Sequence, residues 1–182
     1  MYELQKIKKS IGVPLESKLI LSVGELNKNK NHEAVIRALA LLEDEDVHYA
    51  IAGIGNLHEY LENLAKGLGI ADRVHLLDYR TDVVDLYKTA DLFIHPSLRE
   101  GLPVALMEAI ASKIPVICSN IRGNIDLVSG NALFEAENVE QIFDEIKFHF
   151  DKDYAEEVKR NYSNLIKYDL EMVSEDMKMI YK

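Results

Sequence analysis

The sequence predicts an α/β fold: a doubly wound parallel sheet of six strands, flanked by helices and followed by a helical C-terminal segment. Two observations carry this prediction. Short apolar runs typical of strands alternate with segments of helical period, and no internal repeat or domain linker interrupts the alternation. Strands that are separated by helices imply right-handed crossovers and one parallel sheet, whose common order is 3-2-1-4-5-6.

The apolar runs give the expected strands, and the segments between them give the expected helices. Strands are expected at 19–23, 49–52, 74–77, 92–95 and 116–118, with a sixth at 132–134. Helices are expected at 33–42, 57–68, 83–89 and 104–112. From Val139 onward the pattern is almost wholly helical, and Val173, Met177 and Ile180 form an apolar stripe typical of packing.

Length and composition favour one domain. The chain has 182 residues and 48% apolar content, which is enough for a single three-layer core. Its formal net charge of -10 disfavours a surface for nucleic acid or anionic membrane, and solubility alone can explain that charge.

Cysteine usage and hydropathy indicate the compartment. Cys118 is the only cysteine and lies on an apolar strand, so we expect a buried, inert thiol, and a reducing compartment fits. The first residues lack an apolar signal core, and no apolar run reaches the roughly 18 residues of a membrane span. We therefore expect a cytoplasmic chain.

Two glutamates stand out after the fourth expected strand. Glu100 lies in the strand-to-helix turn, beside Gly101 and just before Pro103, which suits the first turn of a helix. Glu108 lies within the helix among apolar residues, so we expect it to face the interior or the wall of a cleft. The amide groups at the helix start favour an anion or a hydroxyl-rich ligand at this turn.

A second polar loop, Gly24 to His32, follows the first strand. Gly24 allows a tight turn toward a ligand, and Lys30 can reach a phosphate as a point charge. In a sheet of order 3-2-1-4-5-6, the loops after strands one and four are neighbours where ligands bind. The two polar loops should therefore form one site.

The glutamate segment resembles the donor-binding half of the retaining GT-B glycosyltransferases of family 4, the bacterial group 1 family. That family's pattern is Pro-Ser-x-x-Glu-Gly, six residues, then Glu-Ala-x-Ala. It is matched here by Pro96, Ser97, Glu100, Gly101, Glu108, Ala109 and Ala111. The resemblance runs from about Lys18 to the C-terminus and is closest to enzymes that assemble capsular or exopolysaccharides. It implies a Rossmann-like domain in which Glu100 contacts hydroxyls of the donor sugar and Glu108 holds the ribose of the nucleotide.

The first loop departs from the family at one position. The family pattern there is Gly-Arg-Leu, three residues, then Lys, and its two basic residues embrace the donor diphosphate. Gly24, Leu26 and Lys30 match, but Glu25 replaces the arginine with the opposite charge. Either Glu25 points away from the diphosphate or another cation compensates, and the candidates are Lys28, Arg99 and Arg122. A structural salt bridge is the alternative role for each of these cations.

A second departure follows the third strand. Asp78 stands where the family usually has a glycine, and Tyr79 and Arg80 follow, where the family lines its base pocket. The Gly53-Ile54-Gly55 segment reads as a strand-to-helix turn. The histidines show no metal-ligand spacing and no Asp-x-Asp is present, so we expect no metal. We expect His95 to be a cleft or core residue rather than a base.

The resemblance implies a donor site and a reaction. Glu100 and Lys30 would be catalytic, and the donor-binding set would be Gly24, Lys30, Tyr79, Arg80, Glu100, Gly101, Leu102, Glu108 and Arg122. The reaction would transfer a sugar from a nucleoside diphosphate sugar, with UDP favoured, to a saccharide or lipid-linked acceptor with retained anomeric configuration. No cofactor is expected beyond this substrate.

The family's second domain has no counterpart in the sequence. Since the first strand begins about eighteen residues from Met1, we expect residues 1–182 to be a single donor-binding domain that lacks the N-terminal acceptor domain and is inactive alone. Attachment to the inner membrane through that missing domain is left open. A non-catalytic nucleotide-sugar-binding subunit or regulator is the main alternative, and another GT-B enzyme such as an epimerase or phosphorylase is a second one.

Overall fold

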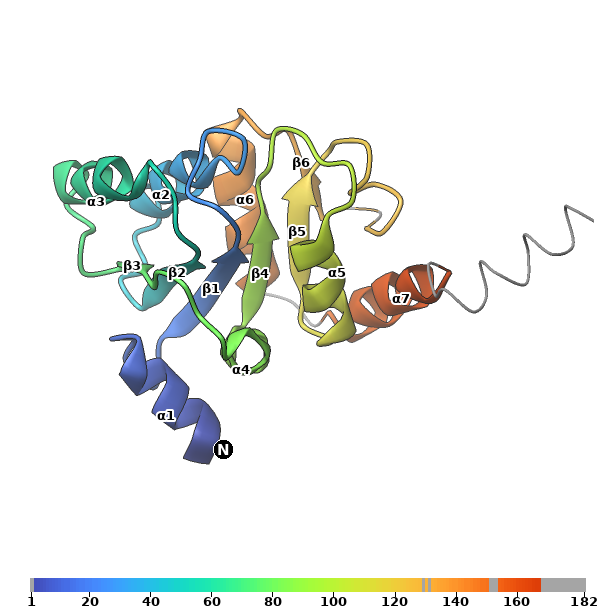
Figure 1. Ribbon diagram of the computed structural model, residues 1–182, viewed down its shortest axis with the longest axis horizontal. Helices are drawn as coiled ribbons and strands as arrows, with labels where there is room; N and C mark the ends of the chain where they lie inside the picture. The colour runs from blue at the N-terminus through green and yellow to red at the C-terminus, as the bar shows by residue number, and fades with distance from the viewer. Residues whose placement is uncertain (1, 129, 131, 151–153, 168–182) are drawn as a thin grey trace, which may run out of the picture.

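The computed structural model describes residues 2–128, 130, 132–150 and 154–167, and its centre is a six-stranded parallel sheet between helices (Figure 1). The strand order is β3-β2-β1-β4-β5-β6, and every neighbouring pair is parallel. The predicted fold class and strand order are therefore confirmed. The order reverses between β1 and β4, which makes their carboxyl ends the expected place for a ligand.

The strands lie close to the predicted ranges. They are β1 Lys18–Val23, β2 Val47–Ala52, β3 Val74–Leu76, β4 Leu92–His95, β5 Val116–Ser119 and β6 Leu133–Phe134. The largest difference is at the start of β2, where Val47 pairs with Lys18 two residues before the predicted beginning. Strands β2, β4 and β5 are buried along their whole length, because helices cover both faces of the sheet.

The described helices are α1 Tyr2–Ser10, α2 His32–Ala40, α3 His58–Gly67, α4 Val83–Thr89, α5 Val104–Ala111, α6 Val139–Phe150 and α7 Ala155–Ile166. Helices α4 and α5 lie on one face of the sheet, with α6 behind it (Figure 1). Helix α1, which packs beside α4, was not among the predicted helices. The predicted stripe of Val173, Met177 and Ile180 lies outside the described residues.

The interior confirms the expectation for the cysteine. Cys118 lies on β5 with no exposed surface, and its burial raises the pKa of the thiol. Such a thiol carries little thiolate at neutral pH and is correspondingly unreactive.

Two glycines allow the loops after β1 and β2 to touch. A Cβ on Gly53 would lie 1.9 Å from the carbonyl oxygen of Gly24, and a Cβ on Gly55 would lie 2.4 Å from that of Leu26. Gly24 N also donates to the carbonyl of Ala52. The Gly53-Ile54-Gly55 turn therefore brings the loop after β2 against the backbone of the predicted ligand-binding loop.

Candidate functional site

The two polar loops meet at the carboxyl ends of β1 and β4, as the sequence predicts. Leu98 N donates to the carbonyl of Asn29 at 2.8 Å, and Asn29 Nδ2 donates to the carbonyl of Arg99 at 3.0 Å. Asn31 Nδ2 adds a bond to the carbonyl of Pro96 at 3.2 Å. These bonds hold two segments in one fixed arrangement: the loop after β1 that carries Lys30, called the lysine loop, and the turn after β4 that carries Glu100, called the glutamate turn.

The centre of this arrangement is an ion pair between the two predicted catalytic residues. Lys30 Nζ lies 2.6 Å from Glu100 Oε1, and the two side chains are 22% and 10% exposed. The lysine stem lies across Gly24, where an added Cβ would come within 3.3 Å of Lys30 Cδ. Gly24 thus leaves room for the lysine to reach the glutamate.

His95 is a partner of Glu100 that the sequence analysis missed. Its ring is buried at the end of β4, and Nε2 lies 3.1 Å from the same oxygen, Glu100 Oε1. Burial tends to raise the pKa of Glu100. Hydrogen bonds from His95, Lys30 and Ser97 outweigh it, however, and lower that pKa to about 2. Because an ionised carboxylate only accepts hydrogen bonds, Nε2 of His95 donates to it. Glu100 is therefore held as an anion.

A buried network supports the glutamate turn from the side of β5. Ser119 Oγ donates to the carbonyl of Ser97 at 2.6 Å, and Asn124 Nδ2 donates to the carbonyl of Ser119 at 3.0 Å. Gly123, at a φ of 98°, lies so close that a Cβ would come within 3.3 Å of the carbonyl oxygen of Glu100. The turn that carries Arg122 is therefore packed against the glutamate turn, and the Arg122 side chain is exposed there.

Glu108 lies elsewhere, on an open wall. It is exposed on α5 and lines a cleft, which is the second of the two positions expected for it, and it does not face the interior. The hydroxyl of Tyr87 on α4 donates to Glu108 Oε2 at 2.9 Å. The cleft has a volume of about 420 Å³ and is lined by Val23, Gly24, Glu25, Ala52, Gly53, Ile54, Tyr79, Arg80, Val83 and Glu108.

Two polar residues of the cleft, Glu25 and Arg80, and Asp78, which precedes Tyr79 in the chain, bear on the predicted departures from the family. Glu25 is exposed and belongs to the cleft wall. Arg80 makes two hydrogen bonds to Asp82, of 2.8 and 2.6 Å, so its charge is already neutralised locally. Asp78, in the family's glycine position, has a φ of 53°. That left-handed conformation explains a preference for glycine there, and aspartate is among the residues that tolerate it.

The remaining predicted residues are all exposed. Tyr79 belongs to the cleft and is 74% exposed. Gly101 and Leu102, at the entrance to α5, are exposed and do not line the cleft. Lys28 and Arg99 are likewise exposed. The predicted site residues therefore form two groups. Lys30 pairs with Glu100, and Gly24, Tyr79, Arg80 and Glu108 line the cleft. Gly24 links the groups, because the stem of Lys30 lies across it.

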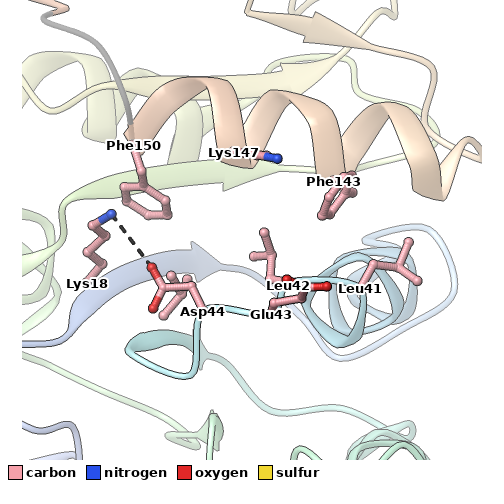
Figure 2. A pocket seen from close by; sticks show the side chains of 9 residues that line it. Lys18, Leu41, Leu42, Glu43, Asp44, Phe143, Lys147 and Phe150 are labelled. Carbon is pink, nitrogen blue, oxygen red and sulfur yellow. Dashed lines mark ion pairs between the residues drawn. The ribbon is translucent and has the colours of Figure 1, made fainter.

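Another hollow, of about 390 Å³, lies at the opposite end of the sheet (Figure 2). Phe143, Lys147 and Phe150 line it from α6, and Lys18 at the start of β1 pairs with Asp44 across 3.9 Å. No residue of the predicted site lines it. Since doubly wound sheets bind ligands at the carboxyl ends of their strands, the cleft beside Glu108 is the stronger candidate.

Within the described residues, no group of three or more histidine, cysteine, aspartate or glutamate side chains is placed to hold a metal ion. In that same part of the chain, no helix is both long and apolar enough to cross a membrane.

Residues 4–167 match the family described as "Glycosyl transferases group 1". The chain belongs to this family. It is 36% identical over 124 residues to an uncharacterised glycosyltransferase of Methanocaldococcus jannaschii, which covers 66% of this chain and 32% of the relative. It is 30% identical over 153 residues to an N-acetylgalactosamine-N,N'-diacetylbacillosaminyl-diphospho-undecaprenol 4-alpha-N-acetylgalactosaminyltransferase of Campylobacter jejuni, covering 82% of this chain and 42% of that enzyme.

Among solved structures, Anabaena Alr3699/HepE in complex with UDP superposes with a TM-score of 0.82 at 19% identity. The match covers 99% of this chain and 52% of HepE, and at this identity it shows the fold alone. The group 1 chain described here thus spans a third to about half of the length of these similar proteins.

Proposed function

We propose that this group 1 chain is the donor-binding domain of a retaining glycosyltransferase and holds a nucleoside diphosphate sugar at the carboxyl edge of β1 and β4. One observation carries the proposal. The family's lysine and first glutamate form an ion pair at this edge, and the second glutamate lines the adjoining cleft. Phosphate, sugar and ribose would therefore have separate places along one continuous surface.

Each end of the donor has a chemically suitable partner. The ammonium of Lys30 and the backbone amides that begin α5 favour the diphosphate and would stabilise it as the leaving group. Glu100 would accept hydrogen bonds from sugar hydroxyls and Glu108 from the ribose, both as carboxylate acceptors. Tyr79, with Ile54 beside it in the cleft, offers an apolar surface for the base.

UDP is the favoured nucleotide, and no cofactor or metal is proposed. The structure of HepE, which shares the fold, contains UDP. The name of the Campylobacter enzyme specifies a lipid-linked acceptor. We therefore propose a saccharide or lipid-linked acceptor in the assembly of a cell-surface polysaccharide at the cytoplasmic side. The acceptor would be bound by a separate N-terminal domain, and residues 1–182 alone would transfer no sugar.

Calorimetric titration of the chain with UDP, UDP-glucose and GDP, with and without a chelator, tests the donor proposal. We expect binding of UDP and its sugar in the presence of chelator. Binding that appears only with magnesium or manganese would contradict the metal-free part, and no binding of any nucleotide would contradict the donor function. Sugar transfer to an added acceptor by residues 1–182 would overturn the proposed need for a second domain.

A non-catalytic nucleotide-sugar-binding subunit is the second candidate, because Glu25 puts a negative charge in the cleft wall where the family has arginine. Turnover by the chain joined to an acceptor domain distinguishes the two. Donor binding without turnover in that two-domain protein would favour the subunit.

A further inference from the structure

The carboxylate of Glu100 is held asymmetrically. Lys30 Nζ at 2.6 Å and His95 Nε2 at 3.1 Å both contact Oε1. The ammonium that the proposed function assigns to the diphosphate is therefore already engaged with a carboxylate. A diphosphate that enters the site has to compete with Glu100 for this ammonium.

The two partners of Oε1 differ in their freedom to move. His95 is 2% exposed at the end of β4, and its ring lies nearly parallel to that of Phe93, with 6.2 Å between centroids. Ser97 Oγ lies 3.3 Å from its Nε2 and adds a further polar contact. Lys30 instead reaches Glu100 from a loop, through a flexible four-carbon stem that lies over Gly24. Lys30 is therefore the partner that can leave.

We propose that His95 is a positioning residue that keeps Glu100 in place when Lys30 turns from Glu100 to the diphosphate of the donor. This inference rests on the proposed function. With His95 present, departure of the ammonium leaves Oε1 hydrogen-bonded. Without it, departure would leave a largely buried carboxylate with the Ser97 hydroxyl as its remaining named donor. Loss of two donors is costly, so Lys30 would stay on Glu100 and the diphosphate would bind weakly. His95 thus acts on the phosphate through Glu100 and Lys30.

A double-mutant cycle between His95 and Glu100, read by titration with UDP, tests the exchange. His95→Leu and His95→Met both remove the ring donor and fill the space beside Phe93 with an apolar side chain. His95→Gln instead keeps an N–H donor near the position of Nε2. We expect His95→Leu or His95→Met to weaken UDP binding about tenfold, the factor for one hydrogen bond to a charged group. His95→Gln should restore binding to within about threefold, which is less than one neutral hydrogen bond.

The same substitutions are then made in the Glu100→Gln background, where no carboxylate retains the ammonium. There we expect His95→Leu to change UDP affinity by less than about twofold, because the coupled pair is already broken. Melting curves for every variant identify those that fold. The UDP affinities of the folded variants are then compared in the cycle.

Three results would overturn the inference. Equal losses in the two backgrounds would mean that His95 acts through general structure, and undiminished UDP binding by His95→Leu and His95→Met would mean that Glu100 does not need it. Failure of the unmodified chain to bind UDP or GDP would remove the proposed function and this inference together, which distinguishes that failure from the other two.

Discussion

The turn that carries Glu100 and the face of α5 that carries Glu108 belong to one sequence motif, but they hold their carboxylates in different ways. Glu100 is largely enclosed and bonded to Lys30 and His95, whereas Glu108 is exposed and receives a bond from Tyr87. Enclosure together with hydrogen-bond donors keeps the Glu100 carboxylate ionised and fixes its direction. Exposure leaves the other carboxylate free to accept bonds from a ligand at small cost to folding.

This difference separates stability from recognition along the motif. The network from Asn124 through Ser119 to the Ser97 backbone stabilises the Glu100 turn, so a change there is expected to affect folding and binding together. A change at Glu108 is expected to affect binding alone.

The largest expected effect is on the pH dependence of folding. The pKa of Glu100 is lowered from 4.5 to about 2, and a shift of that size corresponds to about 3 kcal/mol of stability. Because the pKa is lower in the folded state, this stability is fully present above about pH 4.5 and is lost as the pH falls toward 2. Denaturant unfolding of the native chain and of Glu100→Gln between pH 2 and 7 measures it. The same pH dependence in both proteins would contradict the assignment.

Lys30→Ala should produce the next largest effect. A hydrogen bond between charged groups contributes about 1.5 to 3 kcal/mol, so we expect UDP binding to weaken roughly tenfold to a hundredfold. Uridine binding should be nearly unchanged, because in the proposed donor site the ammonium would contact the phosphates and not the base. Calorimetry with both ligands measures the difference, and Lys28→Ala, an exposed lysine on the same loop, is the matched control. Equal losses for uridine and UDP would indicate that Lys30 acts through folding.

The sequence predicts most of the sheet because apolar runs, helical periods and chain direction determine which strands pair. It also places Lys30 beside Glu100, since the order 3-2-1-4-5-6 makes their loops neighbours. The direction of Glu108 could not be predicted in the same way. Apolar residues surround it along the whole of α5, so the sequence does not distinguish a buried face from an exposed one.

Two other features depend on contacts that a sequence pattern does not contain. His95 contacts Glu100 only because the turn after β4 folds back, which brings together two residues five positions apart in the sequence. In the sequence itself, His95 is the last residue of an apolar strand. Helix α1 was not predicted, although Leu4, Ile7 and Ile11 have the i, i+3, i+7 spacing of one helical face, and packing against α4 supports it in the structure. The left-handed conformation of Asp78 was signalled only by the family's glycine at that position.

Substitution of the two glutamates should separate the two ends of the donor. We expect Glu100→Gln to weaken a UDP-sugar about tenfold and to leave UDP bound at least as tightly, because Lys30 is released. Glu108→Gln should weaken UDP and UDP-sugar alike, by about threefold to tenfold, since both carry the ribose, and should leave the melting temperature nearly unchanged. Titration of both ligands with melting curves measures this. An equal cost to both ligands from Glu100→Gln, or native binding by a folded Glu108→Gln, would refute the assignment.

The smallest expected effect comes from Glu25, the residue at which this chain departs from its family. Glu25 lies in the cleft wall, in the loop that carries Lys30, so its charge opposes an incoming diphosphate across partly screened solvent. Glu25→Arg replaces this repulsion by attraction, and because exposed charge pairs contribute only about 0.2 to 1 kcal/mol, UDP affinity should rise about twofold to fivefold. The gain should shrink at high salt. Glu16→Arg makes the same charge change at an exposed position before β1, at the far end of the sheet, and controls for net charge. A gain of equal size in both variants would show that overall charge, and not the position of Glu25, sets the affinity.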